Sequence, residues 1–144
     1  MNRLALSYQL RSATIEDAAA VHALLLASRE QIGLAERFVN TQYVQWVGSE
    51  CSKGNVSIMT IGGLGIAGAM ILDGDELAYL VVSPGCRKHG IGTRLLEHAK
   101  TMRETVITET LMTNEAMQKA LQANGFHPCD RRKTNNMCSF VWQR

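Results

Sequence analysis

The stretch Val81–Leu96, "VVSPGCRKHGIGTRLL", joins two segments of different periodicity. It continues the run Leu77–Val82, which is apolar at consecutive positions, as expected of a strand covered on both faces at the centre of a sheet. From Lys88 onward, apolar residues recur at helical spacing: Ile91, Leu95, Leu96, Ala99 and Met102. The stretch therefore predicts a buried strand, a glycine-containing loop and a helix of about four turns.

The glycines of this stretch fall where the predicted helix begins. The first N–H groups of a helix have no acceptor inside it, and the positive end of the helix dipole lies behind them. Gly90 and Gly92 carry no side chain that would keep a ligand from this backbone, and Arg87, Lys88 and Arg94 add positive charge. The pattern predicts a site for a phosphate or pyrophosphate. The alternative is an ordinary glycine-rich helix start with surface cations.

A second glycine cluster has the spacing G-x-G-x-x-G at Gly63, Gly65 and Gly68. A dinucleotide-binding turn needs a helix that begins at its glycines and an acidic residue about 20 positions later. Here the following residues are β-like, and Lys88 stands at the later position. We expect a tight hairpin at Gly62 and Gly63, with Gly65 and Gly68 marking a bulge or a close approach of another segment. The hypothesis that the protein is a nucleotide oxidoreductase rests on these three glycines alone.

The remaining patterns alternate between strands and helices. Thr14 and Asp17 resemble a capping box, and Asn114 or Thr113 stands at an N-cap position with Gly125 at the matching C′ position. The predicted strands are 7–14, 55–61, 64–72, 76–82, 104–111, 126–132 and 137–143, and the predicted helices are 15–30, 41–51, 88–102 and 113–124. This order predicts an α/β sandwich with a mixed sheet.

Length and composition set further expectations. A chain of 144 residues with 46% hydrophobic content has the size of one domain, so we expect a single domain over residues 1–144. Met1–Leu10 lacks the apolar run of a signal peptide, and Leu77–Val82 is too short to cross a bilayer. We therefore expect a cytoplasmic protein with no membrane partner. The four cysteines and four histidines lack metal-ligand spacing, so no metal site is predicted.

Charge is distributed unevenly along the chain. Residues 1–86 carry 5 Lys or Arg against 8 Asp or Glu, whereas residues 87–144 carry 10 against 5. The asymmetry favours an anionic ligand for the C-terminal half. The basic run Arg131–Lys133 is short and has no interleaved aromatic residues. We therefore expect it to be a solvated strand end, and no nucleic-acid partner.

The opening stretch resembles the acetyl-CoA signature of the GNAT N-acetyltransferases. In that family a strand ending in V-x-P is followed by [RQ]-x-x-G-x-[GA] and a helix with two leucines, as in "VVSPGCRKHGIGTRLL". The segment "TNEAMQKALQANGF", residues 113–126, is similar to the family's later helix, which runs from N-x-x-[AM] to G-F. The resemblance covers nearly the whole chain. It implies an acyl-CoA N-acyltransferase fold, with a central, mostly antiparallel mixed sheet flanked by about four helices.

The resemblance also implies how acetyl-CoA binds as the acetyl donor. The pyrophosphate would lie on the loop formed by Arg87, Lys88, His89, Gly90, Ile91, Gly92 and Thr93. The pantetheine arm would pair like an extra strand with Leu80, Val81 and Val82, and an N–H near Val82 would polarise the thioester carbonyl. Asn114, besides capping its helix, would touch the pantetheine arm.

Acetylation of an amine needs a base, because an amine with a pKa near about 10 is protonated at neutral pH. Glu76 stands 11 residues before Arg87 and resembles the base of several family members, while Glu109 resembles the base of others. Either could instead be a solvated residue. Many members place a proton-donating tyrosine four residues before the glycine of G-F, where this chain has Leu121. Tyr79 is a possible substitute, although it could also be a packed aromatic.

The leading hypothesis is an acetyl-CoA-dependent N-acetyltransferase acting on a primary amine of a small molecule or peptide. The negative balance of residues 1–86 mildly favours a cationic amine. The alternative is a non-catalytic acyl-CoA-binding or regulatory module, motivated by Leu121. A homodimer is also possible, because the closing strands, with Phe140, Val141 and Trp142, could form a dimer edge.

Overall fold

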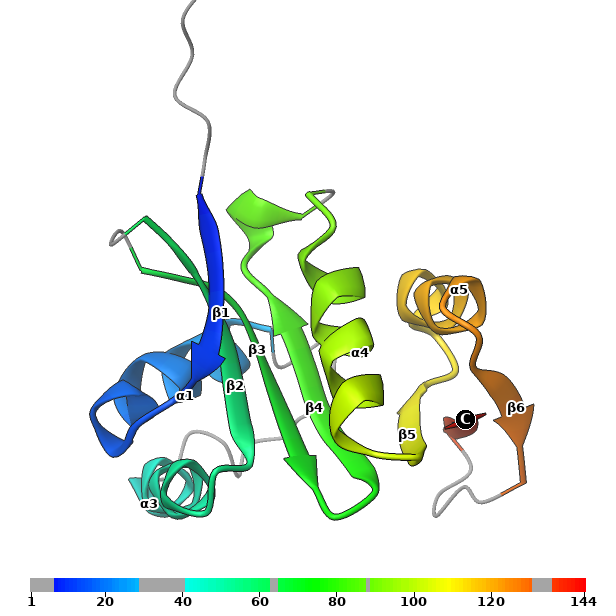
Figure 1. The fold of residues 1–144 in the computed structure, drawn as a ribbon, viewed down its shortest axis with the longest axis horizontal. Coiled ribbons are helices and arrows are strands. Elements are labelled where there is room, and N and C mark those ends of the chain that lie inside the picture. The colour runs from blue at the N-terminus through cyan, green and yellow to red at the C-terminus, as the bar shows by residue number, and fades with distance from the viewer. Residues whose placement is uncertain (1–6, 29–40, 63–64, 88, 131–135) are drawn as a thin grey trace, which may run out of the picture.

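The structure is a computed structural model that describes residues 7–28, 41–62, 65–87, 89–130 and 136–144. Seven strands form one sheet in the order β1-β2-β3-β4-β5-β7-β6 (Figure 1). The strands are β1 (Tyr8–Ser12), β2 (Val56–Ile61), β3 (Ile66–Asp73), β4 (Glu76–Val82), β5 (Thr105–Leu111), β6 (His127–Cys129) and β7 (Met137–Gln143). The helices are η1 (Ile15–Asp17), α1 (Ala18–Ala27), α3 (Thr41–Ser52), η3 (Pro84–Cys86), α4 (Ile91–Met102) and α5 (Glu115–Ala123).

The sheet is mixed, as predicted. The β4–β5 pair is parallel and the other neighbouring pairs are antiparallel. Strands β2, β3 and β4 form the expected meander, and β4 is the middle strand of the seven. The predicted fold class and the strand and helix order are therefore confirmed for the described residues.

Two hydrophobic cores cover the two faces of the sheet. Side chains of β3 alternate between them: Ala69 and Ile71 belong to the core beneath α1 and α3, and Met70 and Leu72 to the core beneath α4 and α5. Helix α4 supplies its apolar stripe to the second core with Ile91, Leu95, Leu96 and Ala99. Because both faces are covered, β3 reads as a nearly continuous apolar run rather than an alternating one.

The N-terminal helix begins at the predicted capping box. The Thr14 N–H donates to Asp17 Oδ2 at 2.7 Å, and Arg11 on β1 pairs with the same carboxylate at 2.8 Å. The hydrogen bond from Arg11 is the main cause that lowers the pKa of Asp17 to about 2. This carboxylate therefore ties the edge strand to the helix start. The predicted part of that helix beyond Ser28 lies outside the described residues.

The second glycine cluster does not form a dinucleotide turn. Strand β3 follows it instead of a helix, and Gly63 lies outside the described residues. Gly68 is a point of close approach, because a Cβ there would stand 2.8 Å from Ile91 Cγ2 and 3.1 Å from the carbonyl oxygen of Val81. The absence of a side chain at Gly68 thus lets α4 pack against the middle of the sheet.

Strand β7 is an inner strand, which corrects one expectation. It pairs with β5 on one side and, at Ser139–Val141, with β6 on the other, so Phe140 and Val141 do not form a sheet edge. Phe140 is buried in the core. The edge is the short strand β6, and the basic run Arg131–Lys133 that follows it lies outside the described residues. The possible homodimer stays a prediction.

Lys100 joins α4 to the end of α5. Its ammonium donates to the carbonyl oxygen of Asn124 and pairs with Glu97 at 3.1 Å. It also lies over the rings of Phe126 and Trp142, 5.9 and 5.4 Å from their centroids. Only 14% of this side chain is exposed, so a largely desolvated cation holds three elements together through its hydrogen bonds and the two aromatic faces.

Candidate functional site

The sheet opens between β4 and β5. The two strands pair only at Glu76–Ile107 and Leu77–Thr108, and the Thr108 hydroxyl fixes the end of this pairing by donating to the Leu77 carbonyl oxygen at 2.9 Å. Immediately afterwards the register between β3 and β4 shifts, so that Ala78 is an extra residue in β4. Because a bulge bends and twists its strand, β4 turns away from β5 here. Its backbone beyond Leu77 is thus left without a strand partner on that side.

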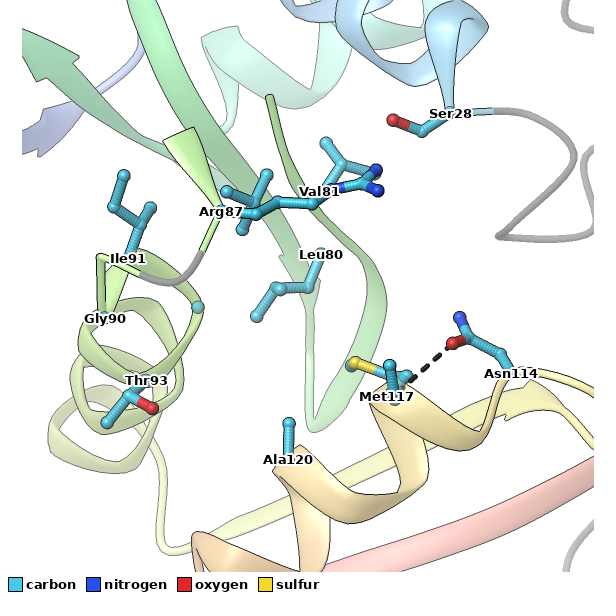
Figure 2. A pocket seen from close by; sticks show the side chains of 13 residues that line it. Ser28, Leu80, Val81, Arg87, Gly90, Ile91, Thr93, Asn114, Met117 and Ala120 are labelled. Atoms are coloured by element: carbon cyan, nitrogen blue, oxygen red, sulfur yellow. Dashed lines mark hydrogen bonds between the residues drawn. The ribbon is translucent and has the colours of Figure 1, made fainter. Parts of the chain in front are cut away.

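A cavity of about 420 Å³ lies at this opening (Figure 2). Most of its walls are aliphatic, and they come from β4, the start of α4 and the inner side of α5. The lining residues are Ser28, Leu80, Val81, Val82, Arg87, Gly90, Ile91, Gly92, Thr93, Asn114, Ala116, Met117 and Ala120. An apolar pocket with a few polar groups at its ends is typical of a small-molecule site.

Nine of the eleven residues predicted to bind the cofactor line this cavity: Leu80, Val81, Val82, Arg87, Gly90, Ile91, Gly92, Thr93 and Asn114. His89 is exposed outside the lining, with its ring centroid 6.3 Å from that of Tyr8. Lys88 lies outside the described residues. The structure therefore brings the strand end and the adjoining glycine loop together with the later helix α5, which starts at Glu115.

The start of α4 forms one end of the cavity. Gly90 is the N-cap in a left-handed conformation, with φ of 77°, which glycine adopts without strain. Arg94 is the first residue whose N–H bonds back within the helix, to the Gly90 carbonyl oxygen at 3.0 Å. The N–H groups before it have no acceptor inside the helix. A Cβ on Gly92 would point at Leu80 and Val82, so this position borders the cavity directly.

Asn114 begins α5 on the opposite wall. Its Oδ1 accepts a hydrogen bond from the Met117 N–H at 3.1 Å, so the predicted N-cap is confirmed (Figure 2). Gly125 has a φ of 86° at the other end of the helix, as predicted for a C′ residue. The cap thereby fixes a pocket residue at the place where the chain enters the helix.

The three predicted catalytic residues lie outside the cavity lining. Glu76 is exposed at the start of β4, and Glu109 is half-buried on β5. Because Glu76 pairs with Ile107 and Glu109 is two residues further along β5, both carboxylates project from the same face of the sheet. Tyr79 is half-buried, and its ring packs edge-on against Trp46 of α3, with centroids 6.0 Å apart. Tyr79 thus makes an aromatic contact, and its proposed role as a proton donor stays a prediction.

Leu121 is fully buried in the core beneath α5 and does not line the cavity. Four lining residues were not predicted from the sequence. Ala116, Met117 and Ala120 follow Asn114 at helical spacing, a signal that could have placed them on the pocket side. Ser28 gives no such signal, because it follows the end of α1 and is separated from the central strand β4 by α3, β2 and β3.

Two further observations concern the described part of the chain. Among those residues, no three His, Cys, Asp or Glu side chains lie close enough together to hold a metal ion. No helix within the described ranges is long and apolar enough to span a membrane.

Comparison with known proteins gives a family match. The family model for the acetyltransferase (GNAT) domain matches residues 52–128, which include the open strand, the glycine loop and α5. No curated protein is similar enough in sequence to be matched.

Solved structures with the same fold cover nearly the whole chain. A GNAT-family acetyltransferase from Bacillus cereus is 19% identical with a TM-score of 0.74, over 96% of this chain and 98% of that one. The PaiA N-acetyltransferase of Thermoplasma acidophilum, solved in complex with coenzyme A, is 15% identical with a TM-score of 0.74, over 96% and 99%. YjaB from Escherichia coli is 19% identical with a TM-score of 0.71, over 94% and 97%. At these identities the likeness concerns the fold.

Proposed function

Since this chain belongs to the GNAT acetyltransferase family, we propose that it transfers the acetyl group of acetyl-CoA to a primary amine of a small molecule or peptide. One observation supports the proposal above all: the part of β4 that does not pair with β5 and the start of α4 border the same cavity. An acyl-CoA needs both, because its pantetheine arm has amide groups that can pair with a strand and its pyrophosphate needs an anion site.

The residues of the cavity suit these two parts of the ligand. The pyrophosphate would accept hydrogen bonds from the N–H groups of Ile91, Gly92 and Thr93, and Arg87, which also lines the cavity, adds positive charge to it. The pantetheine arm would lie along Leu80–Val82, between the aliphatic walls of β4 and α5. The PaiA enzyme of similar fold was solved in complex with coenzyme A.

The reaction would proceed by direct attack. The amine nitrogen, after losing a proton to a base, bonds to the thioester carbonyl carbon; the C–S bond then breaks, and the thiolate takes up a proton. A backbone N–H near Val82 would stabilise the developing oxyanion. Glu76 and Glu109 are the proposed bases, and because neither lines the cavity, the proton would pass through water. Tyr79 remains a candidate donor to the thiolate.

Release of the CoA thiol across a panel of amines, polyamines, amino acids and peptides tests this function. We expect at least one acceptor to support turnover, and the net negative charge of residues 1–86 favours a cationic one. Glu76→Gln and Glu109→Gln are matched variants that keep shape and remove the base. The variant that lacks the true base should lose about 10²- to 10⁴-fold in kcat, together with the acidic limb of its pH–rate profile.

A non-catalytic acyl-CoA-binding module is the second candidate, favoured by the burial of Leu121 at the position where many family members have tyrosine. CoA binding without turnover for any acceptor, and no effect of either glutamine variant, would support it. We further propose that residues 1–144 form one domain that acts in the cytoplasm and that it can form a homodimer. Sedimentation of the full chain tests the dimer.

A further inference from the structure

Ser28 contributes a buried hydroxyl to the cavity. The residue caps the C-terminal end of α1 and is 4% exposed. Its backbone N–H is satisfied by the carbonyl oxygens of Leu24 and Leu25, at 3.2 and 3.1 Å. Its Oγ, however, has no hydrogen-bond partner among the described residues. A serine at the end of a helix ordinarily bonds back to a carbonyl of the preceding turn, so an unused hydroxyl here is unusual.

The hydroxyl faces the cavity. Ser28 is a lining residue, and Figure 2 shows its oxygen turned toward the pocket interior from the end of α1. The aliphatic Val81 and the cationic Arg87 line the same cavity. A buried polar group without a partner costs free energy in the empty protein, and a ligand group that bonds to it removes that cost.

Ser28 and the anion end of the cavity come from opposite faces of the sheet. Helix α1 packs on the core of one face, whereas α4 packs on the core of the other. The cavity therefore reaches through the opening between β4 and β5. An elongated ligand whose phosphates lie at the start of α4 would extend its other end toward Ser28. In an acyl-CoA that end carries the thioester.

We propose that the Ser28 hydroxyl donates a hydrogen bond to the carbonyl oxygen of the bound acyl thioester. This inference rests on the proposed acyl-CoA function and adds a residue that fixes the reacting group. The carbonyl oxygen is the strong acceptor at that end of the ligand, whereas a thioester sulfur is a weak one. The same bond would strengthen as negative charge develops on the oxygen during attack by the amine.

The chain offers a matched control. Ser139 on β7 is the other buried hydroxyl without a partner in the described part of the chain, and it is 2% exposed. It does not line the cavity. Ser28→Ala and Ser139→Ala thus make the same chemical change at equally buried sites. Both variants should keep or raise the melting temperature, because each removes an unsatisfied polar group.

Calorimetric titration of the full chain with CoA and with acetyl-CoA, without acceptor, tests the inference. Only acetyl-CoA has the thioester carbonyl, so Ser28→Ala should weaken acetyl-CoA binding about 3- to 10-fold and change CoA binding less than about twofold. Ser139→Ala should change neither. Ser28→Cys has similar volume but a weak donor, and it should behave like the alanine variant. Where turnover is measured, kcat/KM of Ser28→Ala should fall about 10²- to 10³-fold.

Each outcome decides the matter. If Ser28→Ala weakens CoA and acetyl-CoA equally, or if the cysteine variant restores acetyl-CoA affinity, the hydroxyl does not bind the thioester carbonyl and the inference is wrong. Equal behaviour of the two alanine variants overturns it as well. If the wild-type protein acetylates no amine but the acetyl-CoA preference still depends on Ser28, the proposed transferase function fails while this inference stands.

Discussion

Gly92 offers a way to block the cavity without harming the fold. It is the second residue of α4, and a Cβ built on it would lie 3.8 Å from Leu80 Cδ2 and 3.8 Å from Val82 Cγ2. Those are ordinary van der Waals distances, so alanine fits without displacing either residue. The new methyl group nevertheless stands between the helix start and β4, where the proposed pyrophosphate approaches the backbone.

The expected loss of CoA affinity follows from the hydrogen bonds that would be lost. A hydrogen bond from an N–H to a charged phosphate contributes about 1.5–3 kcal/mol, which corresponds to roughly 10- to 150-fold in Kd. We expect Gly92→Ala to weaken CoA binding about tenfold. Gly92→Val, which adds two further carbons toward the cavity, should weaken it at least about 100-fold. Stability should not fall for alanine, because glycine inside a helix is about 1 kcal/mol less favourable than alanine.

Isothermal titration with CoA, combined with thermal unfolding, measures both quantities. Gly85→Ala is the control, because a Cβ at Gly85 would meet nothing within 4 Å and Gly85 does not line the cavity. It should bind CoA like the wild-type protein. If Gly92→Val is folded and binds CoA within about twofold of wild type, the pyrophosphate does not lie at the start of α4 and the reasoning fails.

Three further predictions concern stability. Gly68→Ala should lower the free energy of unfolding, measured by chemical denaturation, by about 1–3 kcal/mol, because its methyl group would collide with α4 and with a strand carbonyl. Gly85→Ala should leave the stability unchanged. Equal stability of the two variants would show that α4 moves freely. Asp17→Asn should lower the free energy of unfolding by about 1 kcal/mol at pH 7, where the Arg11 pair is formed. The difference from wild type should shrink as the pH falls below about 4 and vanish below the folded-state pKa of about 2, because a lowered carboxylate pKa stabilises fully above the unfolded-state pKa and this stabilisation is lost as the pH falls through the folded-state pKa. An equal loss at pH 7 and at pH 2 would contradict this. Lys100→Met should lower the melting temperature measured by circular dichroism, because the Asn124 carbonyl at the end of α5 loses its hydrogen-bond donor. An unchanged melting temperature would mean that the Lys100 ammonium does not stabilise the end of α5.

Local sequence patterns were sufficient to predict the strands and helices. The predicted bounds of β4 and β7 agree with the structure, and α5 begins after Asn114 and is followed by Gly125 as expected. These features depend on neighbouring residues: alternation, helical spacing and caps act over a few positions. For the same reason the glycine loop could be assigned to the start of α4, while the spacing of Gly63, Gly65 and Gly68 alone was misleading.

Contacts across the fold were beyond such patterns. The sequence suggested that Phe140–Trp142 could form an edge, but β7 lies between β5 and β6 because β6 folds back onto it. The sequence predicted a bulge or a close approach of another segment at Gly65 and Gly68, but it did not show that α4 is the segment that approaches Gly68, since the two meet only when the sheet is assembled. Strand order is a matter of long-range pairing, and a residue's own neighbours in sequence do not determine it.

The sequence by itself determined the kind of site. A strand, a glycine-containing helix start and a capped later helix were sufficient to predict a phosphate-binding loop and a family resemblance, because backbone N–H groups at a helix start follow from local conformation. Only the tertiary structure decided the shape of that site. The bulge at Ala78 parts β4 from β5, and the opening admits the hydroxyl of Ser28 from a helix on the other face of the sheet. Whether a buried hydroxyl has a hydrogen-bond partner depends on residues that are distant in the sequence, so only the tertiary structure shows it.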